Sequence, residues 1–375
     1  MTRRVLISAA VLMLAGHVSG QEPQFFYPLP PAADIVVTKA VSYGPAQMEL
    51  ILPRRSGGGP LPVVVFFFLT PPGMPRLAIY DAWGRAAAGS GLAAVLPDLR
   101  ESSAATDFGT LLAYVSANAG RLGLDAARIV VFAQSANVSL ALPLVQDPAE
   151  TRVAAAVMYY GSAQVATFRR DLPLLFIRAG LDRPPVNRAI ADLLGRAVEQ
   201  NAPVTLLNHP SGHHGFETID DDASTRVVID RTLAFAKEAT APGYQSAVRR
   251  GVAESTAAAL VMTSNFAEAA LRYGQLVSAR PDDHRLRLSY GEALLGAGQF
   301  GAACLEFETL KGKGLGARDL GLPAARACLQ HGDQDKAIAW LASIPRRFLP
   351  DSVRQDPAFA PLQARPEFQA LFSKR

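Results

Sequence analysis

Short apolar runs alternate with longer amphipathic stretches from about residue 34 to residue 240. Several of these runs are apolar at consecutive positions, as expected for strands of a parallel sheet that helices cover on both faces. The alternation of strand-like and helix-like segments predicts a three-layer α/β domain over residues 34–240. The predicted strands are Met48–Leu52, Val63–Leu69, Ala93–Leu96, Ile129–Phe132, Ala154–Tyr160, Leu174–Arg178 and Val204–Leu207, and the clearest predicted helices are Tyr80–Ala88, Phe108–Arg121 and Val186–Gln200.

Alanine-rich helical periodicity replaces the strand-like runs from about Tyr244 onward. Four sets of positions recur at an interval of 34 residues, which indicates a repeated structural unit. Small residues recur where paired helices would approach closely, and large residues recur where the space between the helices needs filling. The four sets are Phe266, Phe300 and Gln334; Ala269, Ala303 and Ala337; Tyr273, Phe307 and Leu341; and Ala257, Gly291 and Ala325.

This 34-residue pattern resembles the tetratricopeptide repeat. Gly298 and Gly332 stand where members of that family turn between helices. Three repeats are the minimum at which such a stack buries its own faces, and the segments around Phe359 and Phe368 suggest a short capping helix. We therefore expect an all-α helical-repeat domain over residues 245–375. An unrelated alanine-rich helical bundle is the alternative.

Residues 1–20 have the three-part pattern of a secretory signal peptide. Arg3 and Arg4 precede an apolar run, and small residues suit cleavage after Gly20. A membrane anchor is the alternative, but a span needs about 20 apolar residues, and His17 ends this run too early. We expect a secreted or periplasmic protein with no stable membrane anchor after cleavage, beginning with a proline-rich entry segment at residues 21–33.

Composition and charge exclude several classes of protein. The 375 residues are 49% hydrophobic and 19% charged, which describes a folded chain rather than a disordered one. The 37 basic and 33 acidic residues give a net charge of +4, too small for a general nucleic-acid-binding surface. Both cysteines, Cys304 and Cys328, lie in the helical region, so the sheet domain has no cysteine nucleophile. They fall on helices that would be neighbours, and either a disulfide or two buried thiols fits the sequence.

One predicted strand runs into a tight turn at Ser135 and then into a helix. Such a turn lifts a hydroxyl above the sheet edge, while the helix N-terminus directs N–H groups at developing charge. With this turn, residues 34–237 resemble the α/β-hydrolase family, particularly its small esterases and dienelactone-hydrolase-like members. Further matching segments are Gly91–Arg100 and Leu122–Ile129. A simple helix N-cap is the alternative role for the serine.

The resemblance implies a catalytic triad in the chain order serine, acid, histidine. Ser135 would be the nucleophile. Asp182 follows the predicted strand Leu174–Arg178 and would be the acid, although it also suits a turn. His214 lies in a His-Gly-Phe segment and would be the base. His213 is the alternative base.

His209 fits a loop histidine, and no carboxylate stands beside the three histidines at the spacing of a zinc site. We therefore expect neither a metal nor a cofactor. The run Asp220, Asp221 and Asp222 reads as a solvated acidic cluster that would hold a cation only weakly.

Two features depart from the family pattern. Family members usually have Gly-x-Ser-x-Gly at the nucleophile turn, whereas this chain has Ala133 and Asn137 in place of the glycines. Esterases of this type also place His-Gly after the strand that corresponds to Val63–Leu69. This chain has Pro71 and Pro72 there, and proline has no N–H to donate.

Ester cleavage needs N–H donors for the tetrahedral oxyanion. We expect the backbone N–H of Ala136 to be one donor and that of Leu69 or Thr70 to be the other. The expected walls of the substrate pocket are Met74, Tyr159 and Tyr160.

Three functions fit these observations. The first is an exported serine hydrolase that cleaves small-molecule carboxylic esters, with the repeats steering a partner or substrate. The second is a hydrolase-fold scaffold that binds a protein or peptide through the repeat groove. The third is a serine peptidase, because the same triad cleaves amides. The sequence sets neither the substrate nor the oligomeric state.

Overall fold

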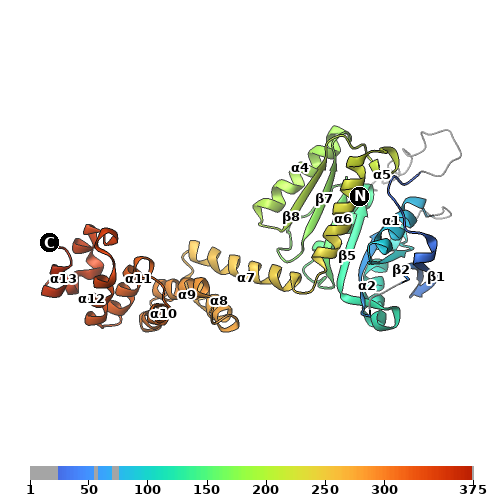
Figure 1. Cartoon of the computed structure of the whole chain (residues 1–375). Coiled ribbons are helices and arrows are strands. Elements are labelled where there is room, and N and C mark those ends of the chain that lie inside the picture. The colour runs from blue at the N-terminus through green and yellow to red at the C-terminus, as the bar shows by residue number, and fades with distance from the viewer. Residues whose placement is uncertain (1–23, 55–57, 70–75, 374–375) are drawn as a thin grey trace, which may run out of the picture. The chain divides into compact units, whose positions relative to one another are not determined.

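A computed structural model describes residues 24–54, 58–69 and 76–373 (Figure 1). The chain divides into two compact units, with the division between Val248 and Arg249. The expected signal peptide at residues 1–20 lies outside the described residues. Within the described parts of the chain, no helix combines the length and apolarity that a bilayer span requires.

The first unit is built on an eight-stranded sheet with the order β1-β2-β4-β3-β5-β6-β7-β8. Strand β2 is antiparallel to both of its neighbours, and all the other pairs are parallel. The carboxyl ends of the parallel strands therefore share one edge of the sheet. The strands are β1 (Ile35–Tyr43), β2 (Ala46–Pro53), β3 (Leu61–Phe67), β4 (Ala93–Pro97), β5 (Leu124–Gln134), β6 (Val153–Tyr159), β7 (Leu174–Ala179) and β8 (Val204–His209).

All seven predicted strands are present, and β1 is an addition. In β1 only the two end residues, Ile35 and Tyr43, are buried. Its one short apolar run, Ile35–Val37, gives way to Thr38 and Lys39, because most side chains of this edge strand face solvent. The pattern of apolar runs therefore does not predict β1.

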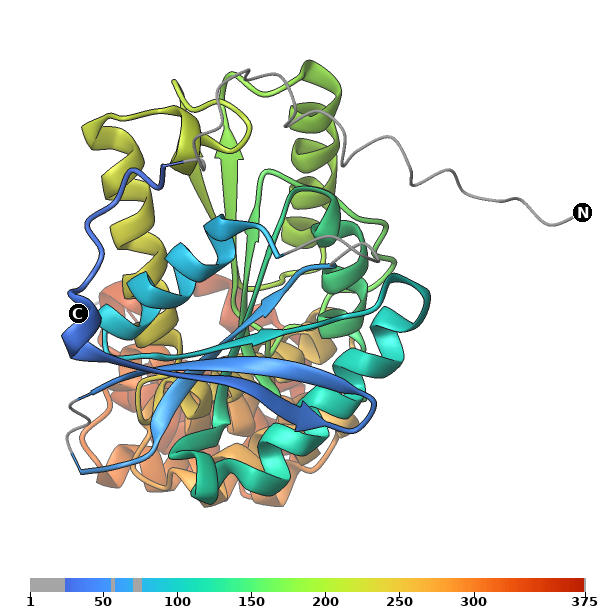
Figure 2. The same ribbon diagram turned by 90° about the vertical axis from the view of Figure 1, so that its right-hand side faces the viewer.

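Helices cover both faces of the sheet, as predicted (Figure 2). One apolar core lies between the sheet and α2, α3 and α4, and a second lies between the sheet and α1 and α6. Successive residues of β3 alternate between the two cores, with Val65 in the first and Phe66 in the second. The helices of this unit are α1 (Ala78–Gly89), α2 (Ala104–Leu122), α3 (Val138–Gln146), α4 (Pro184–Glu199), α5 (Phe216–Ile219) and α6 (Ala223–Ala239).

The second unit is all-helical, and its helices follow the 34-residue period. Helices α8, α10 and α12 begin at Phe266, Phe300 and Gln334, the three positions of the first repeating set. Gly298 and Gly332 have positive φ angles of 75° and 97° in the turns that precede α10 and α12. The helices are α7 (Tyr244–Met262), which crosses the division, α8 (Phe266–Ala279), α9 (His284–Gly296), α10 (Phe300–Gly312), α11 (Ala317–Gln330), α12 (Gln334–Ser343) and α13 (Pro366–Ala370).

Small residues allow the helices of the second unit to pack closely. The repeated alanines Ala269, Ala303 and Ala337 are fully buried. A Cβ atom added to Gly291 would lie 2.9 Å from the ring of Phe307, so only glycine fits there. Three 3₁₀ helices and α13 close the array at its C-terminal end. The 3₁₀ helices are Arg346–Phe348, Asp351–Gln355 and Pro357–Leu362.

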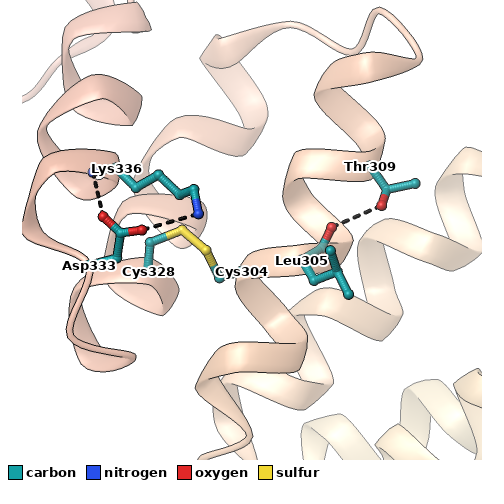
Figure 3. The surroundings of a disulfide bond; sticks show 6 residues. All are labelled: Cys304, Leu305, Thr309, Cys328, Asp333 and Lys336. Atoms are coloured by element: carbon teal, nitrogen blue, oxygen red, sulfur yellow. Dashed lines mark hydrogen bonds and ion pairs between the residues drawn. A yellow bond between two sulfur atoms is a disulfide. The ribbon is translucent and has the colours of Figure 1, made fainter.

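A disulfide bond joins Cys304 of α10 to Cys328 of α11, which settles the question that the sequence left open (Figure 3). Both residues are buried in the apolar core of the helical unit. The bond spans 24 residues and links the second helix pair to the third.

Candidate active site

Strand β5 ends at Gln134, and the backbone of the next residue, Ser135, has a φ of 55°. This left-handed conformation is unfavourable for a residue with a side chain and is typical of strained functional turns. The short 3₁₀ helix Ser135–Asn137 follows and leads directly into α3. The serine hydroxyl therefore lies at the carboxyl edge of the sheet, at the start of a helix.

A glycine just after the neighbouring strand β6 makes room for this turn. Gly161 comes two residues after β6, and a Cβ atom there would lie 2.4 Å from the carbonyl oxygen of Ser135 and 2.6 Å from a methyl group of Val138. The sequence alone does not point to Gly161, because its neighbour in space, Ser135, lies 26 positions earlier in the chain. In the family pattern the two glycines of the turn itself provide this space, and in this chain Gly161 provides it.

Ser135, His214 and Asp182 form a continuous chain of hydrogen bonds. Ser135 Oγ lies 2.8 Å from His214 Nε2, and His214 Nδ1 lies 2.6 Å from Asp182 Oδ2. An ionised carboxylate only accepts, so Nδ1 carries the proton and Nε2 accepts from the serine hydroxyl. The side chain of Asp182 is 1% exposed and that of His214 is 34% exposed, which leaves the histidine partly open to solvent.

The fold explains how residues so distant in sequence meet. Ser135 follows β5, Asp182 follows β7 and His214 follows β8, and these three parallel strands end at the same edge. Asp182 is fixed further by the backbone N–H of Arg183, which donates to Asp182 Oδ1 at 2.7 Å. Asn187 holds the same loop by donating to backbone carbonyl groups, including that of Ala179 at 3.0 Å.

His213 pairs with Asp220, whereas Ser135 pairs with His214. His213 Nδ1 lies 2.7 Å from Asp220 Oδ1, and the His213 backbone N–H donates to Asp220 Oδ2 at 2.8 Å. Asp220 therefore clamps the loop that carries His214. The other two aspartates of the predicted acidic cluster are also engaged, because Asp221 pairs with Arg226 and Asp222 caps α6.

The interpretation of His209 as a loop histidine is wrong. It is the last residue of β8, is 1% exposed, and its Nε2 lies 3.1 Å from the hydroxyl of Thr225. Among the described residues, no group of three or more histidine, cysteine, aspartate or glutamate side chains is placed to hold a metal ion.

The Leu69 N–H, expected to face the oxyanion, is taken by another group. It donates to Asn137 Oδ1 at 3.1 Å, and the amide nitrogen of Asn137 donates to the hydroxyl of Tyr80 at 3.1 Å. Asn137 has an ordinary helical φ of −65°, so this position does not need the backbone freedom of glycine. Its side chain ties the serine turn to the end of β3, a contact across 68 residues that the sequence did not reveal.

Of the other expected oxyanion donors, Ala136 lies in the first turn after the serine. Backbone N–H groups in a first helical turn have no intrahelical acceptor, and Ala136 is exposed, so this N–H can face a bound ligand. Thr70 lies outside the described residues.

Neither tyrosine lines an open pocket, which corrects two of the expected pocket walls. Tyr159 is fully buried, and its hydroxyl lies 2.7 Å from that of Thr232 in the core beneath α6. Tyr160 is 2% exposed, and its ring centroid lies 4.6 Å from that of His214. Tyr160 therefore supports the histidine from the protein side. The third expected wall, Met74, lies outside the described residues.

No protein-family model and no curated protein matches this chain. Solved esterase structures are similar to it at low sequence identity. A structure from a study of two fungal esterases from Rhizomucor miehei has a TM-score of 0.48 and 13% identity, covering 57% of this chain and 86% of its own. A bacterial heroin esterase has a TM-score of 0.47 and 16% identity, covering 56% and 85%.

The esterase Est22 with p-nitrophenol has a TM-score of 0.45 and 15% identity, covering 55% of this chain and 82% of its own. The first unit is an eight-stranded, largely parallel α/β sheet with helices on both faces. A fold of this kind hosts many activities, so the chemistry has to be argued from the residues of the site.

Proposed function

We propose that this chain is a serine hydrolase that cleaves carboxylic esters through an acyl-enzyme intermediate. The observation that carries the proposal is the hydrogen-bonded chain from Ser135 through His214 to Asp182, with the serine in a strained turn at a helix start. These are the relations that nucleophile, general base and orienting acid need in acyl transfer.

In the proposed reaction, Ser135 Oγ attacks the ester carbonyl carbon while His214 Nε2 accepts the hydroxyl proton. Asp182 keeps the imidazole in the required tautomer and offsets the positive charge that forms on it. The N–H of Ala136 stabilises the oxyanion. The carbon–oxygen bond to the alcohol then breaks, and the alcohol leaves with the proton from His214. Water, deprotonated by His214, releases the carboxylic acid and regenerates Ser135.

The test is labelling with a fluorophosphonate probe together with hydrolysis of p-nitrophenyl acetate and butyrate. We expect labelling and turnover in the wild-type protein and neither in Ser135→Ala. His214→Ala should lower kcat by about 10³-fold or more. His213→Ala is its matched control, because this neighbouring histidine bonds to Asp220 and should leave kcat within about threefold. A wild-type protein that neither labels nor turns over would refute the proposal.

A binding scaffold is the second candidate function, and one observation favours it. Asn137 Oδ1 accepts the Leu69 N–H, so a donor expected to stabilise the oxyanion is already paired. A scaffold would bind a protein or peptide through the helical repeats, and it would fail the labelling test while remaining folded.

We also propose that the protein acts outside the cytoplasm and that its second unit is a tetratricopeptide-like array. The Cys304–Cys328 disulfide supports export, because disulfide bonds persist mainly in oxidising compartments. Helix starts spaced by 34 residues support the repeat assignment. Fractionation of expressing cells, compared with a chain that lacks residues 1–20, tests the first point.

A further inference from the structure

Glu217 is a fully buried carboxyl group close to the proposed base. It lies on α5, three residues after His214, and is 0% exposed. Glutamate is rarely buried completely, because removing its charge from water is costly unless partners compensate. A glutamine or an apolar residue would fill the same space without that cost. The position therefore calls for an explanation beyond packing.

The structure fixes Glu217 at both its backbone and its side chain. Its backbone carbonyl accepts a hydrogen bond from the Phe26 N–H at 2.8 Å. Its Oε1 accepts from the hydroxyl of Tyr160 at 2.6 Å. Tyr160 in turn places its ring against the imidazole of His214, with a centroid distance of 4.6 Å. A short chain of contacts therefore leads from the buried carboxyl group to the base.

The groups that face the carboxyl group come from three directions. Helix α1 contributes Tyr80 and Trp83, the end of β6 contributes Tyr159 and Tyr160, and the loop after β8 contributes His214. Burial is the largest influence on Glu217 and raises its pKa above the usual value, while the Tyr160 hydroxyl and the charge of His214 act in the opposite direction. His214 is the only one of these groups that becomes positive in the proposed reaction.

We propose that Glu217 is a positioning residue for His214: with Tyr160 it holds the imidazole, and its carboxylate offsets the charge of the imidazolium ion. This inference rests on the proposed serine-hydrolase function. Asp182 performs the corresponding task at Nδ1, and Glu217 adds a second, buried negative charge on the side of Tyr160. The carboxylate does not touch the substrate.

The charge of Glu217 should favour the protonated form of His214. A nearby carboxylate stabilises the positively charged imidazole relative to the neutral one. Glu217→Gln keeps an acceptor for the Tyr160 hydroxyl but removes the charge, so His214 should take up its proton at a lower pH than in the wild type. Tyr160→Phe removes a hydrogen bond that stabilises the carboxylate, and it should shift the pKa of His214 in the same direction by a smaller amount.

The experiment is an NMR titration of the full chain with labelled histidine, in which the signal of His214 is assigned from its loss in His214→Ala. Wild type is compared with Glu217→Gln, Tyr160→Phe and Glu49→Gln. Glu49 is a matched control, because its carboxylate pairs with Arg76 on another part of the sheet. We expect the pKa of His214 to fall in the first two variants and to stay unchanged in the third.

The kinetic counterpart is the acid limb of kcat/KM, which should move to lower pH in Glu217→Gln, with kcat reduced about tenfold and KM unchanged. An unchanged pKa of His214 in a folded Glu217→Gln protein would overturn the proposal. The titration tests the role of Glu217 and does not require turnover. Fluorophosphonate labelling of the wild type tests the serine-hydrolase function, so the two proposals can fail separately.

Discussion

Asn137 shows how one side chain sets the state of the site. It stands where the family pattern has glycine, and it links the Leu69 N–H to the hydroxyl of Tyr80. The link holds the serine turn to the end of β3, and in the proposed reaction it leaves the Leu69 N–H unavailable to the oxyanion. These two effects have opposite consequences for stability and for catalysis.

We expect Asn137→Ala to raise kcat for p-nitrophenyl acetate by about tenfold, because it frees the Leu69 N–H. One oxyanion donor is worth about 10²–10³ in turnover, and the freed N–H should recover part of that factor. The same change should lower the free energy of unfolding by about 1–2 kcal/mol through the two lost hydrogen bonds. Steady-state kinetics and urea denaturation measure the two effects. A lower kcat would show that Asn137 assists the reaction instead.

The backbone of Ser135 is strained, because its φ angle is positive at 55°. Glycine adopts this conformation freely, whereas alanine keeps the strain and lacks only the hydroxyl. We therefore expect Ser135→Gly to be more stable than Ser135→Ala by about 1 kcal/mol. Both variants are inactive in the proposal, so denaturation curves compare them without any effect of turnover. Equal stabilities would contradict the assignment of strain to this residue.

At the scale of elements, one buried aspartate joins the end of β4 to the start of α2. Asp107 accepts hydrogen bonds from the side chain and backbone of Arg100 and from the hydroxyl of Ser103. The Arg100 guanidinium lowers the pKa of Asp107 to about 2. The carboxylate is therefore favoured in the folded state over the unfolded state.

A depressed pKa gives stability that is complete above the unfolded value of about 4. We expect this contribution to disappear as the pH falls from about 4 to about 2, because protonation then becomes equal in the two states. Urea midpoints of wild type and Asp107→Asn measured across this range should converge at the acid end. A constant difference between the two proteins would contradict the assignment.

The elements themselves were largely predictable from the sequence, because burial on both faces gives parallel strands continuous apolar runs. Burial on both faces also made the orientation of Tyr159 unpredictable from the sequence. Every residue of β6 is buried, so no alternation of polar and apolar positions told which face each side chain occupies. The order of Ser135, Asp182 and His214 was readable from the family pattern. The contacts of Asn137, Gly161 and Glu217 were not, because each depends on neighbours that only the fold supplies.

At the scale of the whole molecule, the two units have separate cores, and the disulfide belongs to the helical unit alone. A bond that closes a loop of 24 residues contributes about 3 kcal/mol in the chain-entropy model. We expect reduction to weaken the protection of amides in α10, α11 and α12 against hydrogen exchange and to leave ester hydrolysis unchanged. Mass spectrometry of the full chain with and without dithiothreitol measures this.

The double variant Cys304→Ala and Cys328→Ala is the control for that experiment. Its exchange pattern should resemble that of the reduced wild type and should not respond to dithiothreitol. Loss of hydrolysis on reduction would contradict the independence of the two units.

The equal spacing of α8, α10 and α12 makes the helical array modular. From α8 to α12, successive helices pack mainly against one another, so a whole pair can be added or lost with only local rearrangement. The disulfide sets one boundary on such changes, because it ties the second pair to the third. Array length can therefore vary between descendants of this chain while the hydrogen-bonded residues at the sheet edge stay as they are.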